Sequence, residues 1–156
     1  MRNKPKNDYS QADWRNQERN AENYRKFKFY RARFEFGKFT NCNFSAVSAK
    51  NSCFIKTDLT GCDFSGANLE GSNFGGAILI GVNFKGAILR HVNFEGANTE
   101  GACFTCVSLH KTRKLVLSEK QVYELIGTEQ CSSKYSAAEI IETKANKTNS
   151  VIIIAE

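Results

Sequence analysis

Large hydrophobic residues recur at every fifth position along most of this chain. Between Cys62 and Phe104 the five-residue unit repeats without an insertion, and its third position is the apolar centre. The same register extends outward in both directions, and only Ala49 and Thr99 interrupt it. The apolar centres are Tyr24, Phe29, Phe34, Phe39, Phe44, Phe54, Leu59, Phe64, Leu69, Phe74, Leu79, Phe84, Leu89, Phe94, Phe104 and Leu109. Self-similarity at a fixed short period indicates a repeat protein.

The other positions of the unit predict a coil with corners. A period of five fits neither the 3.6 residues of a helical turn nor the alternation of a plain strand. If each unit is one short extended side, positions one and three point inward and positions two and four point outward. Position one is small in every unit from Ala32 to Val107, and Asn or Asp is frequent at position two. Position five then forms the corner, where eight units carry the conformationally permissive Gly. Those glycines are Gly61, Gly66, Gly71, Gly76, Gly81, Gly86, Gly96 and Gly101.

Units such as Ala67-Asn68-Leu69-Glu70-Gly71 resemble the pentapeptide-repeat family, whose pattern is A-(D/N)-L/F-x-x. The resemblance extends from about Glu22 to Lys111. It implies an all-β solenoid, a right-handed quadrilateral β-helix of four to five coils with four units per coil. A short C-terminal α-helical cap completes the fold that the resemblance implies. The motif is specific for fold and says little about function.

Twenty residues per coil predict which centres stack. Two aromatic columns should face each other across the core, with mainly aliphatic columns between them. One aromatic column is Phe34, Phe54, Phe74 and Phe94, and the other is Tyr24, Phe44, Phe64, Phe84 and Phe104. Each buried ring or Leu contributes about 1.5–3 kcal/mol of transfer free energy. The core therefore needs no cofactor, and Ala49 and Thr99 are its weak layers.

The chain ends depart from the repeat. We assign residues 1–21 to a basic N-terminal arm and a helical or irregular cap. The reason is that Arg19 stands at position three of its unit, where the repeat requires an apolar residue. The β-helix spans residues 22–111, and a helical cap follows in residues 112–130. The capping box Ser118-Glu119-Lys120-Gln121 predicts a helix over residues 119–126. In the tail, residues 131–156, a short helix is possible over 137–143, and residues 151–154 could add a strand or stay flexible.

Charge is concentrated near the N-terminus. Residues 1–37 hold ten Lys or Arg and five Asp or Glu, against six and five in residues 38–111. In this basic part Phe27, Phe29 and Phe34 should point inward, and the cations should point outward. Interleaved aromatic and basic residues can bind nucleic acid, although a first coil with core rings and solvated cations explains the same pattern. The outward cations of interest are Lys28, Arg33 and Lys38.

Catalytic and metal chemistry find no support in the sequence. The two histidines, His91 and His110, fall on a corner and an outward position without a nucleophile. The six cysteines, in a chain without a signal-like apolar run, predict reduced thiols rather than a disulfide framework. Cys103 and Cys106 form an isolated C-x-x-C, which is insufficient for a metal site. We expect a non-enzymatic cytoplasmic protein without metal or cofactor.

Two binding functions remain. The first is a scaffold or regulatory module that docks a protein partner, with Ile78, Ile80 and Ile88 as outward apolar residues. The second is implied by the resemblance, since some family members mimic DNA, bind type II topoisomerases such as gyrase and protect them from quinolones. That activity needs an acidic surface, and this chain carries a formal charge of +6. Nucleic-acid contact through the basic N-terminal region is a weaker alternative, and a homodimer through the C-terminal cap is compatible with the sequence.

Overall fold

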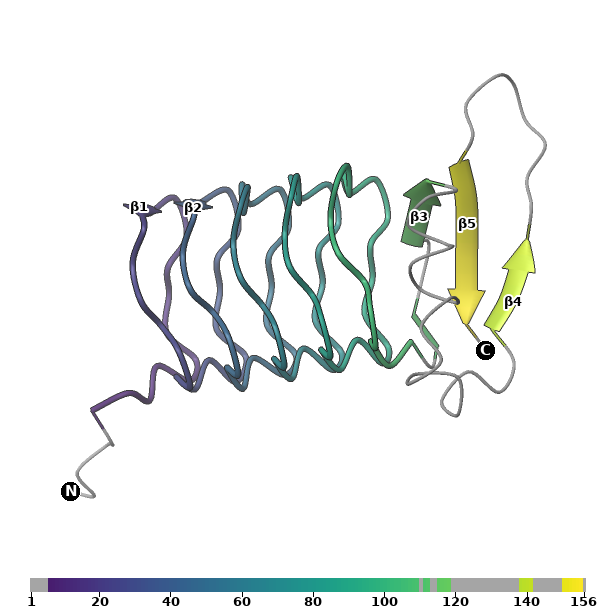
Figure 1. The fold of residues 1–156 in the computed structure, drawn as a ribbon. Helices are drawn as coiled ribbons and strands as arrows, with labels where there is room; N and C mark the ends of the chain where they lie inside the picture. The colour runs from purple at the N-terminus through teal and green to yellow at the C-terminus, as the bar shows by residue number, and fades with distance from the viewer. Residues whose placement is uncertain (1–5, 110, 113–114, 119–137, 142–149, 156) are drawn as a thin grey trace.

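The computed structural model describes residues 6–109, 111–112, 115–118, 138–141 and 150–155. A coiled rod is followed by a small sheet (Figure 1). The strands are β1 (Glu18–Asn20), β2 (Lys38–Thr40), β3 (Leu115–Ser118), β4 (Ala138–Ile141) and β5 (Ser150–Ala155). No helix occurs in these ranges, so none of the described chain could cross a membrane as a helix.

The rod is a β-helix with a repeat of twenty residues. Parallel bridges join each position-two residue to its equivalent in the next coil, from Asp8 to Lys28 and finally from Ile88 to Ser108. Because successive equivalents are always twenty residues apart, each coil contains four five-residue sides. The predicted coil is therefore confirmed. We name the sides after their centres in one coil, as the Leu69, Phe74, Leu79 and Phe84 sides.

Each corner is a tight turn with a left-handed residue at position five. In a representative corner the Ala77 N–H donates to the Phe74 carbonyl at 3.0 Å, and Gly76 between them has φ +63°. A positive φ at the third residue of such a turn defines a type II turn. Every corner from Gln11 to Lys56 places a residue other than Gly in this conformation, whereas every corner from Gly61 to Gly86 is Gly.

This geometry predicts the effect of adding one methyl group at a corner. Gly81 has φ +65°, and a Cβ there would meet no atom within 4 Å. Gly81→Ala should therefore lower the free energy of unfolding by about 1 kcal/mol through backbone strain alone. Chemical denaturation measures the change, and Ala46→Gly, at a corner with φ +54°, should leave stability equal or higher. A more stable Gly81→Ala protein would show that this turn is not left-handed.

The core consists of the predicted columns. Rings on the Phe74 side stack in parallel, with centroids 4.7 Å apart for both Phe34–Phe54 and Phe54–Phe74. Rings of the facing columns meet edge-on, as in Phe54–Phe64 at 5.9 Å and 86°. These are the offset and T-shaped arrangements that aromatic pairs favour. Ala49 is fully buried, so the smaller side chain does not open this layer to solvent.

Small polar residues at position one bind the backbone of the preceding coil. The hydroxyls of Thr57, Ser72 and Thr112 each donate to the centre carbonyl 23 residues earlier, at 2.7–2.8 Å. Each of these hydroxyls is buried and satisfied, which removes the cost of an unpaired polar group. At position two, Asn and Asp accept the N–H two residues later, as Asp63 does from Ser65 at 2.9 Å. The repeat therefore fixes its corners and its stacking with side chains as well as the backbone.

The β-helix begins earlier than the sequence predicted. Residues 8–21, assigned above to an arm and a helical or irregular cap, already carry parallel bridges and corners with φ of +55° to +62°. Trp14 fills a core place and packs on Phe34 with centroids 6.0 Å apart. Arg19 does occupy a centre, but it lies exposed on β1, which pairs with β2. The prediction of a separate cap was wrong because one charged centre at an open end does not stop the coil.

The C-terminal part also differs from expectation. The predicted helix over residues 119–126 lies outside the described residues. β4 is a strand within the segment 137–143, where a helix was considered possible, and β5 realises the strand option for residues 151–154. The three strands form an antiparallel sheet in the order β3-β5-β4. Thr99 donates to the Val116 carbonyl at 2.6 Å, so this weak layer of the core also anchors β3.

Candidate interaction surfaces

The six residues selected from the sequence do not form one surface. Ile78 and Ile80 lie together on the Leu79 side, and Lys38 lies on the same side two coils earlier, through the bridges Lys38–Asp58 and Asp58–Ile78. Ile88 and Lys28 belong to the opposite Leu69 side, and Arg33 belongs to the Phe74 side. All six occupy outward position two or four, as predicted. Only the Ile78–Ile80 pair brings apolar side chains together.

That pair is the centre of an uncharged stretch of the chain. Ile78 is 41% exposed and Ile80 is 37% exposed. No charged residue occurs from Gly71 to Phe84, and Gly75 and Gly76 leave the neighbouring corner without protruding side chains. Polar residues border the pair in the adjacent coils, with Asp58 and Asn98 bridged to Ile78 on either side. We call Ile78, Ile80 and the Gly75–Gly76 corner the isoleucine patch.

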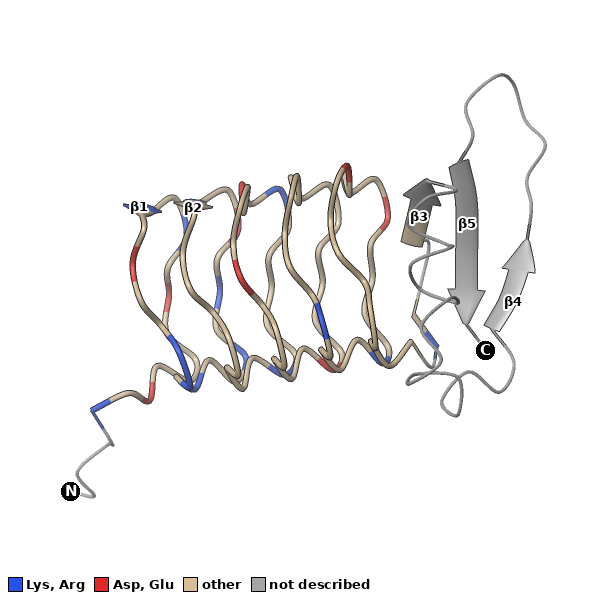
Figure 2. Ribbon diagram, in the orientation of Figure 1, with Lys and Arg blue, Asp and Glu red and all other residues tan. Residues whose placement is uncertain are grey.

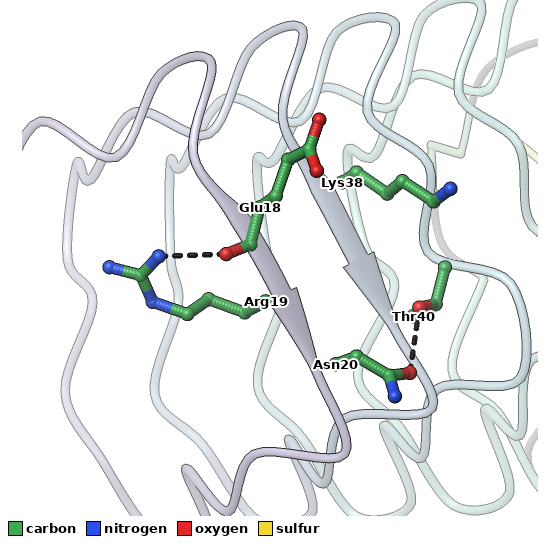
Figure 3. Close-up of a pocket in the computed structure, with 5 residues that line it drawn as sticks. All are labelled: Glu18, Arg19, Asn20, Lys38 and Thr40. Carbon is green, nitrogen blue, oxygen red and sulfur yellow. Dashed lines mark hydrogen bonds between the residues drawn. The ribbon is translucent and has the colours of Figure 1, made fainter.

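A shallow hollow lies across β1 and β2 near the first coil (Figure 3). Its volume is about 340 Å³, and its lining is Glu18, Arg19, Asn20, Lys38 and Thr40. The Arg19 guanidinium donates to the Glu18 carbonyl at 2.7 Å, and Thr40 donates to the Asn20 side chain at 2.9 Å. These groups satisfy one another at an exposed surface. The hollow holds no nucleophile paired with a base.

Two exposed rings escaped the sequence analysis. Tyr30 is 37% exposed and Phe36 is 59% exposed. Each has a cation over its face, with the Arg31 guanidinium carbon 5.0 Å from the Tyr30 centroid and the Lys56 nitrogen 5.8 Å from the Phe36 centroid. The register contained the signal, because these residues occupy outward position four and corner position five.

Charges of both signs are interspersed along the coil (Figure 2). On the Leu69 side they form a ladder, in which Glu70 pairs with Lys50 at 2.8 Å and with Arg90 at 3.5 Å. The hydrogen bond from the Lys50 ammonium lowers the pKa of the Glu70 carboxyl below its ordinary value. The ladder is exposed to solvent, so its contribution to stability is small. The described coil presents no continuous acidic face.

The cysteines offer no reactive site among the described residues. Cys42 and Cys62 are 1% exposed, and the neighbouring Cys42 sulfur together with burial raises the pKa of the Cys62 thiol. Cys106 is disulfide-bonded, whereas Cys42, Cys53, Cys62 and Cys103 are free. The prediction of reduced thiols was therefore wrong for Cys106. It rested on the expected compartment. A disulfide requires two Cβ atoms within reach of each other and an oxidant for the two thiols.

Acid, base and metal-ligand groups are dispersed over the coil. No cluster of three His, Cys, Asp or Glu side chains that could hold a metal occurs within the described ranges. His91 lies exposed at a corner with φ +58°, and His110 lies outside the described residues. The outward surfaces of the coil are therefore the candidate functional regions, and they are suited to binding.

A family model described as a pentapeptide repeat region matches residues 27–104. The chain belongs to the pentapeptide-repeat family. Its coil begins about one turn before the matched region. Residues 8–26 have the same coil geometry, but their sequence departs from the repeat pattern, so the family model does not include them. The predicted family is confirmed. The comparison with curated proteins gave no match.

The chain is similar to several solved pentapeptide-repeat structures. A pentapeptide repeat protein from the Arabidopsis thaliana thylakoid lumen is 25% identical, with a TM-score of 0.63 over 70% of this chain and 75% of that chain. HetL from the cyanobacterium Nostoc, involved in heterocyst differentiation regulation, is 19% identical, with coverages of 67% and 46% and a TM-score of 0.37. QnrB1, a plasmid-mediated fluoroquinolone resistance protein, is 24% identical in one structure, with coverages of 62% and 52% and a TM-score of 0.43. The chain thus spans about half the length of HetL and of that QnrB1 chain.

Proposed function

We propose that this pentapeptide-repeat protein is a non-enzymatic interaction module that docks a protein partner on the isoleucine patch. The observation that carries the proposal is the exposure of Ile78 and Ile80 side by side, at 41% and 37%, within a stretch of the chain, Gly71 to Phe84, that contains no charged residue. An apolar centre with a polar rim is the usual anatomy of a protein interface. The flat Gly75–Gly76 corner lets a partner approach the backbone closely.

The rigidity of the coil supports this function. The interior is filled with Phe and Leu side chains that are buried to 1% exposure or less, such as Leu79 beneath the patch. The outward side chains are held by a backbone that is bonded to the coils on both sides. A partner therefore meets a preorganised surface, which reduces the entropy lost on binding.

DNA mimicry receives less support from the surface. A DNA mimic has to present a dense row of negative charge, and within the described coil Asp58, Asp63 and Glu70 lie on three different sides. Glu70 is also neutralised by Lys50 and Arg90. The similarity to QnrB1 is limited to the fold. We therefore retain the protein-docking module as the proposed function.

The Ile78→Asp/Ile80→Asp variant tests the proposal. Two carboxylates at the patch centre should abolish capture of the partner, because burying an unpaired charge in an interface is costly. Both side chains point outward, so the melting temperature should stay within about 3 °C of the parent. The measurement is quantitative mass spectrometry of proteins from the native host that the immobilised chain retains.

Lys85→Asp is the matched control, since Lys85 is exposed on the adjacent Phe84 side. The partner should be retained by the parent and by Lys85→Asp and lost only from the patch variant. Equal retention by all three proteins would exclude the isoleucine patch as the docking surface.

A further inference from the structure

The second coil, residues 27–46, presents two aromatic rings to solvent instead of burying them. Among the large hydrophobic side chains of the described residues, Phe36 has the largest exposed fraction, at 59%. Tyr30 also points outward and is 37% exposed. Tyr30 is on the Leu69 side, and Phe36 is at the corner between the Phe74 and Leu79 sides. The two rings therefore flank the Phe74 side of this coil at its two ends.

Phe36 is held in a backbone conformation that does not suit it. Its φ is +59°, and the later corners of the same column are Lys56, with φ +52°, and then Gly76 and Gly96. A bulky side chain in the left-handed region costs about 1–2 kcal/mol relative to the ordinary conformation. The exposed ring contributes little burial to offset that cost. Every corner from Gln11 to Lys56 shares this conformation, and Phe36 is the one among them that places an aromatic ring there. A strained corner that exposes an aromatic ring is an indicator of function.

Cations surround both rings. Arg31 lies over Tyr30 and Lys56 lies over Phe36, at 5.0 and 5.8 Å from the ring centroids. The second coil contains four Lys or Arg and one Glu, a net charge of 4 − 1 = +3. Its one acid, Glu35, is 8% exposed and bonded to Arg33 at 3.1 Å, so it adds little negative potential at the surface. The exposed groups are therefore aromatic faces and positive charges.

We infer that Tyr30, Arg31, Phe36 and Lys56 form a binding site for single-stranded nucleic acid. Bases stack on the two rings, and the flanking cations bind the phosphates between them. Aromatic platforms within a positive groove or stripe are the general means of binding single strands without sequence preference. The six-residue separation of the rings along an extended side is at most about 20 Å. That distance is within the span of a short single strand, since sites of about 4–16 nucleotides are usual.

Other anionic partners fit these observations less well. A duplex keeps its bases stacked inside, so it would use the cations and leave the strained Phe36 ring without a contact. An acidic peptide would likewise pair with the cations and has no flat π-face for each ring. This site shares no residue with the isoleucine patch, although the Lys56 side chain lies next to the Gly76 corner of that patch. The inference does not rest on the proposed function.

Fluorescence anisotropy of a labelled thymidine oligonucleotide of about 15 residues, titrated with the full chain, tests the inference. Phe36→Gly should bind about tenfold more weakly, because one stacking platform is lost. The same variant should be as stable as the parent or more stable, because Gly relieves the corner strain. A loss of binding with no loss of stability is not expected from a structural role. Phe36→Tyr, which keeps a ring, should retain binding.

Salt dependence provides a second measurement. The Arg31→Gln/Lys56→Gln variant should lower the slope of log K against log salt concentration by about 1.4, since each lost phosphate contact removes about 0.7 for a single strand. Ile78→Ser/Ile80→Ser, which adds no charge, should bind the oligonucleotide as the parent does. The inference is overturned if Phe36→Gly binds like the parent, or if a duplex of equal length binds as tightly. Binding of an oligoglutamate peptide that is equally tight and lost in the same variants would also overturn it, and would assign the site to acidic protein segments.

Discussion

Phe84→Ala should lower the free energy of unfolding by about 3–5 kcal/mol. The Phe84 ring is completely buried and stacks between Phe64 at 5.7 Å and Phe104 at 5.2 Å. Its edge also meets the Phe74 ring of the facing column at 6.0 Å. Removing the ring leaves a cavity. The neighbouring coils cannot move to fill it, because backbone hydrogen bonds fix the spacing between coils. Chemical denaturation measures the loss.

Lys85→Ala is the matched control for this substitution. Lys85 follows Phe84 in the chain, but its side chain is exposed at position four. Truncation there should change stability by less than about 0.5 kcal/mol. Equal losses for the two variants would contradict the alternation of inward and outward positions on which the whole register depends.

Trp14→Ala should lower the free energy of unfolding by about 2–4 kcal/mol, the second largest effect that we expect. Trp14 is partly exposed at the open end, yet its ring packs against Tyr9 at 5.4 Å and Tyr24 at 5.6 Å. Beneath it lie Phe29 and Phe34, each with its centroid 6.0 Å away. It therefore covers the first complete layer of the core, and its loss exposes those rings to water.

Denaturant titration of Trp14→Ala and Trp14→Phe separates packing from a general effect of substitution. Phe should restore most of the lost stability because it still covers Phe34. Trp14 is the only tryptophan of the chain, so its emission in the parent reports whether the first coil unfolds with the rest. An effect below about 0.5 kcal/mol would mean that the N-terminal coil is not integral to the folded unit.

The coil could be predicted because its register is over-determined. The centres, the small residues at position one and the corner glycines each repeat at five, so any one of them fixes the other two. The stacking of Phe54, Phe74 and Phe94 then followed from twenty residues per coil. The same register also places Tyr30 and Phe36 outward. Both are aromatic residues that do not occupy the inward position three of a unit, so the sequence contained the information needed to identify them.

The ends could not be predicted in the same way. A charged residue at position three ends the coil only if that position is enclosed by other coils. Arg19 lies at the open end, where its guanidinium is 6.0 Å from the Trp14 ring centroid and reaches solvent. The next centre, Tyr24, is only 7% exposed, so the core closes immediately beneath. This burial raises the pKa of Tyr24 to about 12. β4 and β5 pair with each other, although residues 142–149 separate them in sequence, and local helix propensity carries no information on such pairing.

The two aromatic and two aliphatic columns also have a consequence for folding fidelity. From Phe54 onward, a coil displaced by one side would set Phe over Leu in most layers, which penalises that slip, whereas a displacement by two sides would return Phe to Phe and Leu to Leu. Residues 27–46 lack this protection, because all four of their centres are Phe. Repetition thus leaves a ten-residue misalignment nearly degenerate. Only irregular residues distinguish one coil from another, and Ala49, Thr99 and Trp14 have that property. Irregular layers of this kind make one alignment of the coils more stable than the others, so that a chain of similar units folds in a single register.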